Sequence, residues 1–213
     1  GVFLLFFFSV STAQKKFYFF QFPHSNERTA EAGGDVNMVN LPLSKPAVPL
    51  AKDKSEFAKI LTAASAVVID NNTKTILFEK NTRAQRPLAS ITKLMTALVL
   101  MDISVDWSTT TVIADSDYDG SDHHVDVGEK FTLEDLWHVA LIGSSNTAIN
   151  ALVRASGLSK DSFVELMNKK AGELRLPSAQ FAEPTGLSEK NIANALDVAK
   201  LLRNALNFDK IYS

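Results

Sequence analysis

Residues 86–101 read RPLASITKLMTALVLM, and this stretch decides the fold. After the proline, apolar side chains recur at three- and four-residue steps, at Ile91, Leu94, Met95, Leu98 and Met101. Other small or apolar residues fill most positions between them, and a helix that is apolar around most of its circumference is buried in a protein. The pattern predicts a central, largely buried helix with Ser90 and Lys93 in its first turns.

The segments on either side predict a mixed domain. Residues 66–70 (AVVID) and 75–79 (TILFE) are β-rich runs around a polar turn, which predicts a β-hairpin. Helices are predicted downstream over residues 133–142, 163–174 and 195–206. Thr132 and Asp135 resemble a capping box for the first of these helices, and Ser159 can cap the second. Two strands followed mostly by helices indicate an α/β or α+β fold.

Composition narrows the chemistry. The 213 residues suffice for one domain, the formal charge is −2, and no cluster of Lys and Arg stands out, so we expect no nucleic-acid partner. Cysteine is absent, which excludes disulfides, thiolate metal sites and thiol nucleophiles. His123 and His124 lie between Asp122 and Asp126 in a polar loop, but adjacent histidines without a helical His pair are weak metal ligands. We predict neither a metal nor an organic cofactor.

The first 13 residues resemble an export signal. Val2 to Val10 is apolar apart from Ser9 and precedes the small residues of 11–13, whereas a spanning helix needs roughly 20 apolar residues. A short buried helix is the alternative. We predict a signal peptide over 1–13, incomplete at its start because no Met or basic segment precedes it, and hence a location in the periplasm or on the outer face of the cytoplasmic membrane.

Residues 14–62 are predicted to form a disordered linker that leads to a catalytic domain over 63–213. The linker has no helical or strand period and is interrupted by Pro23, Pro42, Pro46 and Pro49. Its aromatic patch, residues 17–20 (FYFF), has the composition of a segment that docks on the domain, on a partner or peripherally on a membrane.

Ser90 and Lys93 have the spacing of a nucleophile and its base. Residues three apart on a helix share a face, so the hydroxyl and the amine can meet. A serine needs a base to take its proton, and a lysine can serve when burial lowers its pKa. A lone Ser-x-x-Lys is expected by chance in such a chain, and its bland interpretation is a solvated helix face. Here the lysine lies in an apolar stretch, where an unpaired ammonium is costly.

Ser144-Ser145-Asn146 is a second candidate. It follows the predicted helix over 133–142 at a Gly143 break, where a hydroxyl and an amide can project from a loop. Simple helix capping explains the same residues.

Two segments resemble a known family. Residues 86–97 (RPLASITKLMTA) look like the active-serine segment of the low-molecular-mass penicillin-binding proteins, the serine D-Ala-D-Ala carboxypeptidases and endopeptidases. Residues 181–188 (FAEPTGLS), with Asn191 and Asp197 downstream, resemble the segment after the middle motif of that family. The resemblance extends from Ser65 to the C-terminus and is closest to the endopeptidase branch. It implies a DD-peptidase/β-lactamase-like fold, with an antiparallel sheet and a helical region.

The resemblance also implies roles for four residues. Ser90 would be the acylated nucleophile, Lys93 its proton acceptor, Ser144 a proton shuttle to the leaving amine, and Asn146 a ligand of Lys93 and of the substrate carbonyl. The backbone N–H of Ser90 would supply half of an oxyanion hole. Glu183 is interpreted as structural rather than as the deacylating base of a β-lactamase.

The Lys-Thr-Gly motif of the family is not found between Asp197 and Ser213, and Pro184-Thr185-Gly186 does not replace it. The C-terminal strands are therefore expected to be missing, either because the sequence is a gene fragment or because it is a truncated, inactive homologue. The 213 residues alone are expected to acylate poorly.

The functional hypothesis is a serine-type D-Ala-D-Ala carboxypeptidase that acts on peptidoglycan stem peptides and is captured covalently by β-lactams. The alternatives are an endopeptidase that cleaves cross-links, a non-catalytic homologue that binds penicillin or peptidoglycan, and, as a weaker rival, a class A β-lactamase.

Overall fold

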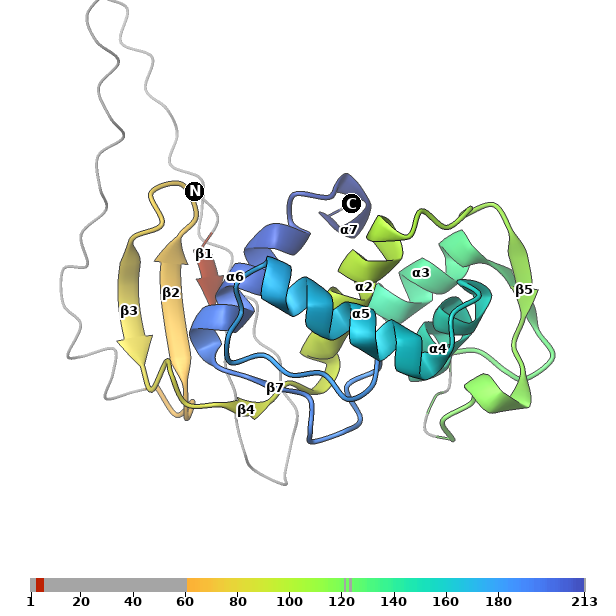
Figure 1. The fold of residues 1–213 in the computed structure, drawn as a ribbon, viewed down its shortest axis with the longest axis horizontal. Helices are drawn as coiled ribbons and strands as arrows, with labels where there is room; N and C mark the ends of the chain where they lie inside the picture. Colours follow the sequence, from red (N-terminus) through yellow and green to blue (C-terminus); the bar gives the residue numbers. More distant parts are fainter. Residues whose placement is uncertain (1–2, 6–60, 121, 123, 213) are drawn as a thin grey trace, which may run out of the picture.

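The computed structural model describes residues 3–5, 61–120, 122 and 124–212. Figure 1 shows a small antiparallel sheet at one end, a group of helices in the middle and a short β-ribbon at the other end. The helices lie between that sheet and this ribbon, so the mixed α and β composition expected from the sequence is observed.

The sheet has the strand order β1-β2-β3. β2 (Ala66–Asp70) and β3 (Ile76–Lys80) pair in antiparallel register, as the hairpin prediction requires. Asp70 closes the turn between them because its carboxylate accepts hydrogen bonds from the backbone N–H and the hydroxyl of Thr73, both at 2.6 Å. β1 (Phe3–Leu5) pairs with the other edge of β2 and falls inside the segment predicted to be an export signal. That signal stays a prediction.

The remaining elements follow in chain order. They are β4 (Arg86–Pro87), the 3-10 helix η1 (Ala89–Ile91), α2 (Thr92–Asp102), β5 (Thr110–Val112), the 3-10 helix η2 (Asp115–Asp117), β6 (Lys130–Thr132), α3 (Leu133–Ile142), α4 (Asn146–Ala155), α5 (Lys160–Glu173), β7 (Ile192–Ala193), α6 (Ala195–Ala205) and α7 (Asp209–Tyr212). β4 pairs with β7, and β5 with β6, each as a two-stranded antiparallel ribbon. The predicted signal peptide over 1–13 and linker over 14–62 lie almost entirely outside the described residues.

α2 is the central helix, as its apolar pattern predicts. It contacts α3, α4, α5 and α6 (Figure 1). Met95 and Leu98 have no exposed surface and pack in the same cluster as Phe163 and Met167 of α5. A second, smaller cluster joins Val67 of β2 to α6, which attaches the sheet to the helices.

The helix boundaries follow from their caps. Thr132 accepts a hydrogen bond from the backbone N–H of Asp135 at 3.0 Å, and α3 begins directly after it, as predicted. Ser159 caps the backbone N–H of Ser162 at 3.1 Å, so α5 begins at Lys160, three residues before the predicted start. The cap sets the boundary here, because the first turn of α5 is polar and carries no apolar pattern.

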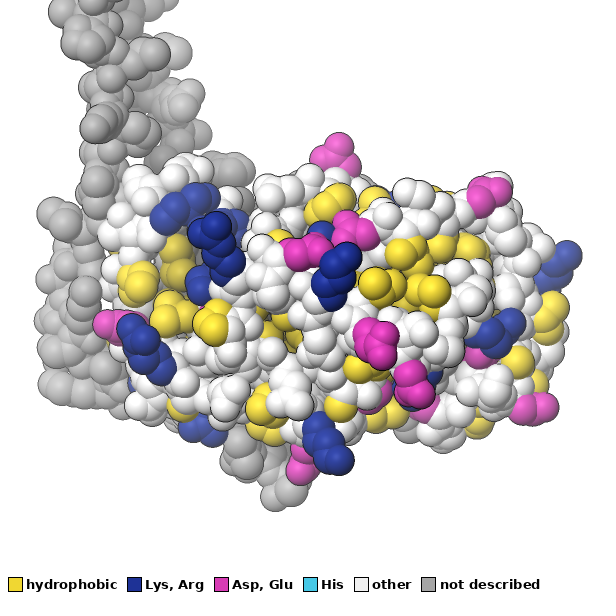
Figure 2. All heavy atoms as spheres, in the orientation of Figure 1, with side chains coloured by type: hydrophobic (Ala, Val, Ile, Leu, Met, Phe, Trp, Pro, Cys, Tyr) yellow, Lys and Arg dark blue, Asp and Glu magenta, His cyan; other side chains and the backbone are white. Residues whose placement is uncertain are grey.

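The surface mixes charges of both signs. On the face drawn in Figure 2, Lys and Arg side chains are interspersed with Asp and Glu, and small hydrophobic areas lie between them. In the part of the chain that the structure describes, no helix is long and apolar enough to cross a membrane.

Candidate active site

Ser90 lies in η1, directly before the buried helix α2, and is exposed to solvent. β4 pairs with β7 just upstream, and the backbone N–H of Leu88 donates to the carbonyl of Asn191 at 2.8 Å, which fixes the approach to the serine. Ala89 has a φ of 46°, in the left-handed region that non-glycine residues rarely adopt. The serine is therefore presented from a constrained backbone at the mouth of a rigid helix.

Lys93 is buried, with 3% of its surface exposed. Its Nζ donates to Ser90 Oγ at 3.3 Å, to Asn146 Oδ1 at 2.6 Å and to the backbone carbonyl of Thr185 at 2.9 Å. The helical spacing predicted that the serine and the lysine share a face, and the structure brings them together. Asn146, 53 residues downstream, joins them as the family resemblance implied.

These three partners give the amine a defined direction. An amide oxygen and a backbone carbonyl can only accept hydrogen bonds, so Asn146 and Thr185 each engage an N–H of Lys93. A neutral amine has two N–H groups and one lone pair. When Lys93 is uncharged, the two fixed acceptors occupy both N–H groups, and the lone pair faces Ser90 Oγ.

Burial lowers the pKa of Lys93 to about 8, from the usual value of 10.5. The nearby negative charges of Glu183, Asp119 and Asp122 raise that pKa and thereby limit the fall. None of the three groups that accept a hydrogen bond from Lys93 is charged. With this pKa, about one tenth of the amine is uncharged at pH 7, which makes a neutral base available.

Ser144 is placed beside Ser90. Its Oγ donates to Ser90 Oγ at 2.9 Å, and both hydroxyls are exposed. Its φ of 58° is also in the left-handed region, so the loop between α3 and α4 holds the side chain in a constrained conformation. Ser90, Lys93 and Ser144 thus form one connected group of proton-carrying atoms.

The Gly143 break predicted that Asn146 lies in a loop. In the structure Asn146 is instead the first residue of α4. Its Nδ2 donates to Asp119 Oδ2 at 2.5 Å, while its Oδ1 faces Lys93. The start of the helix is set by Ser145, whose Oγ accepts from the backbone N–H of Ala148 at 2.9 Å. Capping and placement next to the lysine therefore coexist in this segment.

Asp122 supports the same helix end. It is buried, and its carboxylate accepts from Ser145 Oγ, from the backbone N–H of Thr147 at 3.0 Å and from the backbone N–H of His124 at 3.0 Å. Burial alone would raise the pKa of Asp122, but these hydrogen bonds outweigh it, so the pKa is lowered. An ionised carboxylate at a helix N-terminus is favourable.

The turn that carries the Thr185 carbonyl is organised by Glu183. Its carboxylate accepts from the N–H groups of Thr185 and Gly186, at 2.7 and 2.6 Å, and from Asn191 Nδ2 at 2.7 Å. Burial would raise the pKa of Glu183, but hydrogen bonds, first those from Thr185, lower it overall. The structural interpretation of Glu183 agrees with these contacts, and its charge additionally acts on Lys93.

Gly186 lets this turn pack directly on the backbone of Ala89 and Ser90. A Cβ at Gly186 would lie 2.0 Å from the carbonyl oxygen of Ala89, and its φ is 101°. Both facts require glycine at this position. Thr96 of α2 fixes the turn from the other side, because its Oγ1 donates to the Pro184 carbonyl at 2.6 Å.

Sequence reasoning missed two contributors to this site. The Thr185 acceptor is a backbone carbonyl, so no residue type reveals it. Asp119 lies in a loop 27 residues before Asn146, and only the fold brings the two together. His124 is exposed, and His123 lies outside the described residues. Over residues 61–120, 122 and 124–212, His, Asp and Glu form no group of three or more that could hold a metal.

Known proteins with the same sequence pattern define the family. Residues 52–211 match the family described as D-alanyl-D-alanine carboxypeptidase. The chain is 35% identical over 164 residues to a D-alanyl-D-alanine endopeptidase of Pseudomonas aeruginosa, covering 76% of this chain and 51% of that protein. It is 33% identical over 167 residues to the D-alanyl-D-alanine carboxypeptidase DacF of Bacillus subtilis, covering 75% of this chain and 42% of that protein.

A solved structure shows the same fold. The crystal structure of the D-alanyl-D-alanine carboxypeptidase DacD from Francisella tularensis matches with a TM-score of 0.66 at 32% identity, covering 71% of this chain and 39% of that chain. The chain spans about half the length of the curated relatives it matches. The fold and the resemblance expected from residues 86–97 are confirmed: the chain belongs to the D-alanyl-D-alanine carboxypeptidase family.

Proposed function

We propose that this protein is a serine-type D-Ala-D-Ala carboxypeptidase that acts on peptidoglycan stem peptides through an acyl-enzyme on Ser90. The observation that carries the proposal is the environment of Lys93, a buried amine whose two fixed acceptors direct its lone pair at Ser90 Oγ. A structural lysine would be paired with a carboxylate or reach solvent.

Acylation begins at Ser90. Lys93 takes the hydroxyl proton as Ser90 Oγ bonds to the carbonyl carbon of the penultimate D-Ala, and a tetrahedral intermediate with an oxyanion forms. The backbone N–H of Ser90 is one donor for that oxyanion, a contribution typically worth about 3 kcal/mol. Collapse of the intermediate breaks the C–N bond, and the leaving amine takes a proton.

Ser144 connects the base to the leaving group. Its Oγ lies 2.9 Å from Ser90 Oγ, which also contacts Lys93 Nζ. In the proposed step, Ser144 gives its hydroxyl proton to the departing D-Ala nitrogen and regains a proton from Lys93. Asn146 holds Lys93 and offers its amide to the substrate carbonyl. Water then attacks the acyl-enzyme and Lys93 takes the water proton. As the ester bond breaks, Lys93 returns that proton to Ser90 Oγ, and the shortened peptide leaves.

A D-alanyl-D-alanine endopeptidase is the second candidate. The relatives divide between the two activities at similar identity, with endopeptidases of Pseudomonas aeruginosa and Escherichia coli at 35% and 32%, and the Bacillus subtilis carboxypeptidase at 33%. The chemistry at Ser90 is the same in both. Incubation of the natural protein with muropeptide monomers and with cross-linked dimers separates them, because a carboxypeptidase releases free D-Ala and an endopeptidase converts dimers to monomers.

The proposed substrate also predicts where the protein acts and which compounds inhibit it. Peptidoglycan lies outside the cytoplasmic membrane, so the proposal includes export to the periplasm or to the outer face of that membrane, consistent with the apolar start of the sequence. β-Lactams present a strained amide to the same serine, so we propose that they acylate Ser90 covalently. A homologue that binds penicillin without turnover would show a persistent acyl-enzyme and no product.

Acylation by a fluorescent penicillin tests the proposal. In the natural protein, mass spectrometry should place the adduct on the peptide that contains Ser90, and Ser90→Ala should abolish labelling. Ser116→Ala is the matched control, because Ser116 is an exposed serine of η2. An adduct on another residue, or labelling that persists in Ser90→Ala, would show that the proposed nucleophile is wrong.

A further inference from the structure

We propose that Asp119 is a positioning residue for the base: its carboxylate determines which end of the Asn146 amide faces Lys93. The inference rests on the proposed roles of Ser90 and Lys93. Asp119 does not touch the reacting atoms in this arrangement, and it acts through the hydrogen bond that it accepts from Asn146 Nδ2 at 2.5 Å.

The two ends of an amide have nearly the same shape but opposite hydrogen-bonding character. Asn146 Oδ1 accepts from Lys93 at 2.6 Å, and an ammonium, which only donates, enforces that orientation by itself. The neutral amine does not, because it also has a lone pair. A reversed amide would donate an N–H to that lone pair and remove it from Ser90.

Asp119 prevents the reversal. A carboxylate only accepts, so it can face Asn146 Nδ2 but not Oδ1. The correct orientation is therefore enforced in the protonation state that performs catalysis, in which Lys93 no longer enforces it. Replacement of the carboxylate by a group that donates, or by none, removes this selection.

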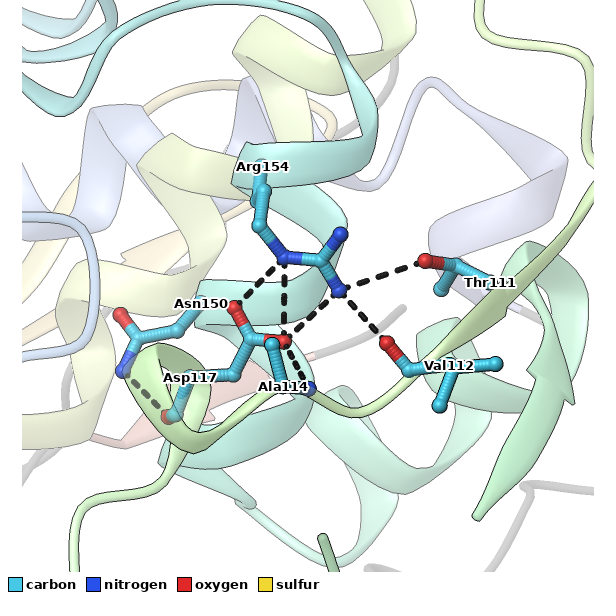
Figure 3. A network of polar contacts seen from close by, with 6 residues as sticks. All are labelled: Thr111, Val112, Ala114, Asp117, Asn150 and Arg154. Atoms are coloured by element: carbon cyan, nitrogen blue, oxygen red, sulfur yellow. Dashed lines mark hydrogen bonds and ion pairs between the residues drawn. The ribbon is translucent and has the colours of Figure 1, made fainter. Parts of the chain in front are cut away.

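The fold holds Asp119 against α4 through a second set of contacts. Figure 3 shows Arg154 of α4 reaching the buried Asp117 at the end of η2, two residues before Asp119. Arg154 Nη2 donates to Asp117 Oδ2 at 2.8 Å and to the Val112 carbonyl at 2.7 Å, and Asn150 Nδ2 donates to the Asp117 carbonyl at 2.9 Å. One helix thus carries Asn146 and also anchors the loop that orients it.

Asp119 has a second, opposing effect through its charge. The negative groups that face Lys93 are Glu183 from the turn, and Asp119 and Asp122 from the loop after η2, and each raises the pKa of the amine. Removal of Asp119 should therefore lower the pKa of Lys93, which moves the acidic limb of an acylation profile to lower pH. Loss of amide orientation should instead lower the rate at every pH.

The two effects can be separated by acylation with benzylpenicillin across pH. In the natural protein, Asp119→Ala and Asp119→Asn should lower the second-order rate constant on the high-pH plateau by about ten- to a hundredfold, while the acidic limb moves down in pH. Asp115→Asn, which removes an exposed charge from η2, should change neither. An unchanged plateau in both Asp119 variants would overturn the proposal.

A measurement on the resting protein tests the same contact without turnover. In spectra of ¹⁵N-labelled protein, the side-chain N–H signals of Asn146 should shift and exchange faster with water in Asp119→Ala but not in Asp115→Asn. Signals that stay unchanged in Asp119→Ala would overturn the proposal. If the wild type is not acylated at all, the function proposed for Ser90 fails, and these signals still decide whether Asp119 orients the amide.

Discussion

Two cations are tied to opposite ends of α4, the exposed Arg154 and the buried Lys93, and their partners differ. At the C-terminal end, the Arg154 guanidinium contacts the Asp117 carboxylate through Nε and Nη2, and this hydrogen bonding raises the pKa of Arg154. At the N-terminal end, Lys93 contacts the neutral oxygens of Asn146, Thr185 and Ser90, and burial lowers the pKa of its amine to about 8.

The comparison shows how one helix supports two uses of positive charge. A carboxylate in direct contact keeps a cation charged and makes it a structural anchor. A carboxylate that is separated from the amine by another side chain, as Asp119 is by Asn146, leaves the amine free to lose its proton. Negative charges are present near both ends, so the difference lies in the burial of the Lys93 amine and in the partner that touches each cation.

The largest effect on acylation is expected when Lys93 is replaced by arginine, the cation found at the other end of α4. Lys93→Arg places a permanently charged group next to Ser90, so no base remains to take the proton. Acylation by penicillin should fall by at least about a thousandfold. Stopped-flow or gel-based labelling of the natural protein measures it. Lys160→Arg, a change at an exposed helix terminus, should leave the rate unchanged.

The next effect brings a carboxylate into contact with the amine. Asn146→Asp should raise the pKa of Lys93 above its value of about 8. The neutral fraction at pH 7, about one tenth when the pKa is 8, falls about tenfold for each unit by which the pKa rises. The acidic limb of the acylation profile should move to higher pH.

A substitution at the surface is the control for this shift of the acidic limb. Asn207→Asp adds the same charge at an exposed position after α6 and should leave the limb in place. A limb near pH 8 in both Asn146→Asp and the wild type would contradict the proposed contact of Asn146 with the base.

A smaller effect, on stability, is expected when the Arg154 cation that contacts Asp117 is removed. Arg154→Met leaves Asp117, which is 2% exposed, without its cation. Loss of one partner of a buried pair costs about 3–5 kcal/mol, but 41% of the Arg154 side chain is exposed, so water reduces the cost. We expect the free energy of unfolding in urea to fall by about 2 kcal/mol. An unchanged midpoint would show that the contact contributes nothing.

The smallest effect is expected at an exposed pair. Lys169 and Glu173 of α5 lie 3.7 Å apart, with 72% and 49% of their side chains exposed. Lys169→Met should change the free energy of unfolding by less than about 0.5 kcal/mol, because solvent and salt screen such pairs. The contrast with Arg154→Met in the same urea titration isolates the effect of burial.

The sequence predicts those parts of the molecule that depend on neighbours along the chain. The buried helix, the hairpin and the caps at Thr132 and Ser159 all follow from local spacing. The proximity of Ser90 to Lys93 also follows from local spacing, because residues three apart on a helix share a face. The positions of Ser144 and Asn146 came from resemblance to a family, since no local pattern brings residues 53 apart into contact.

The remaining contacts are not encoded by any local pattern. Asp119 lies in an irregular loop where acidic residues are common, and its partner depends on how η2 is anchored to α4. The acceptor at Thr185 belongs to the backbone. The charged state of Lys93 depends on burial and on carboxylates from two separate segments, so the sequence indicates an apolar surrounding but no pKa.

The backbone carbonyl of Thr185 that accepts from Lys93 affects which substitutions this turn tolerates. Because the Thr185 carbonyl is part of the backbone, a different side chain at 185 leaves that ligand of the amine in place. A methyl group at 186 would instead meet the Ala89 oxygen and push the whole turn off the nucleophile segment. Variants of this turn are therefore expected to keep glycine at 186 even where the side chain at 185 has changed.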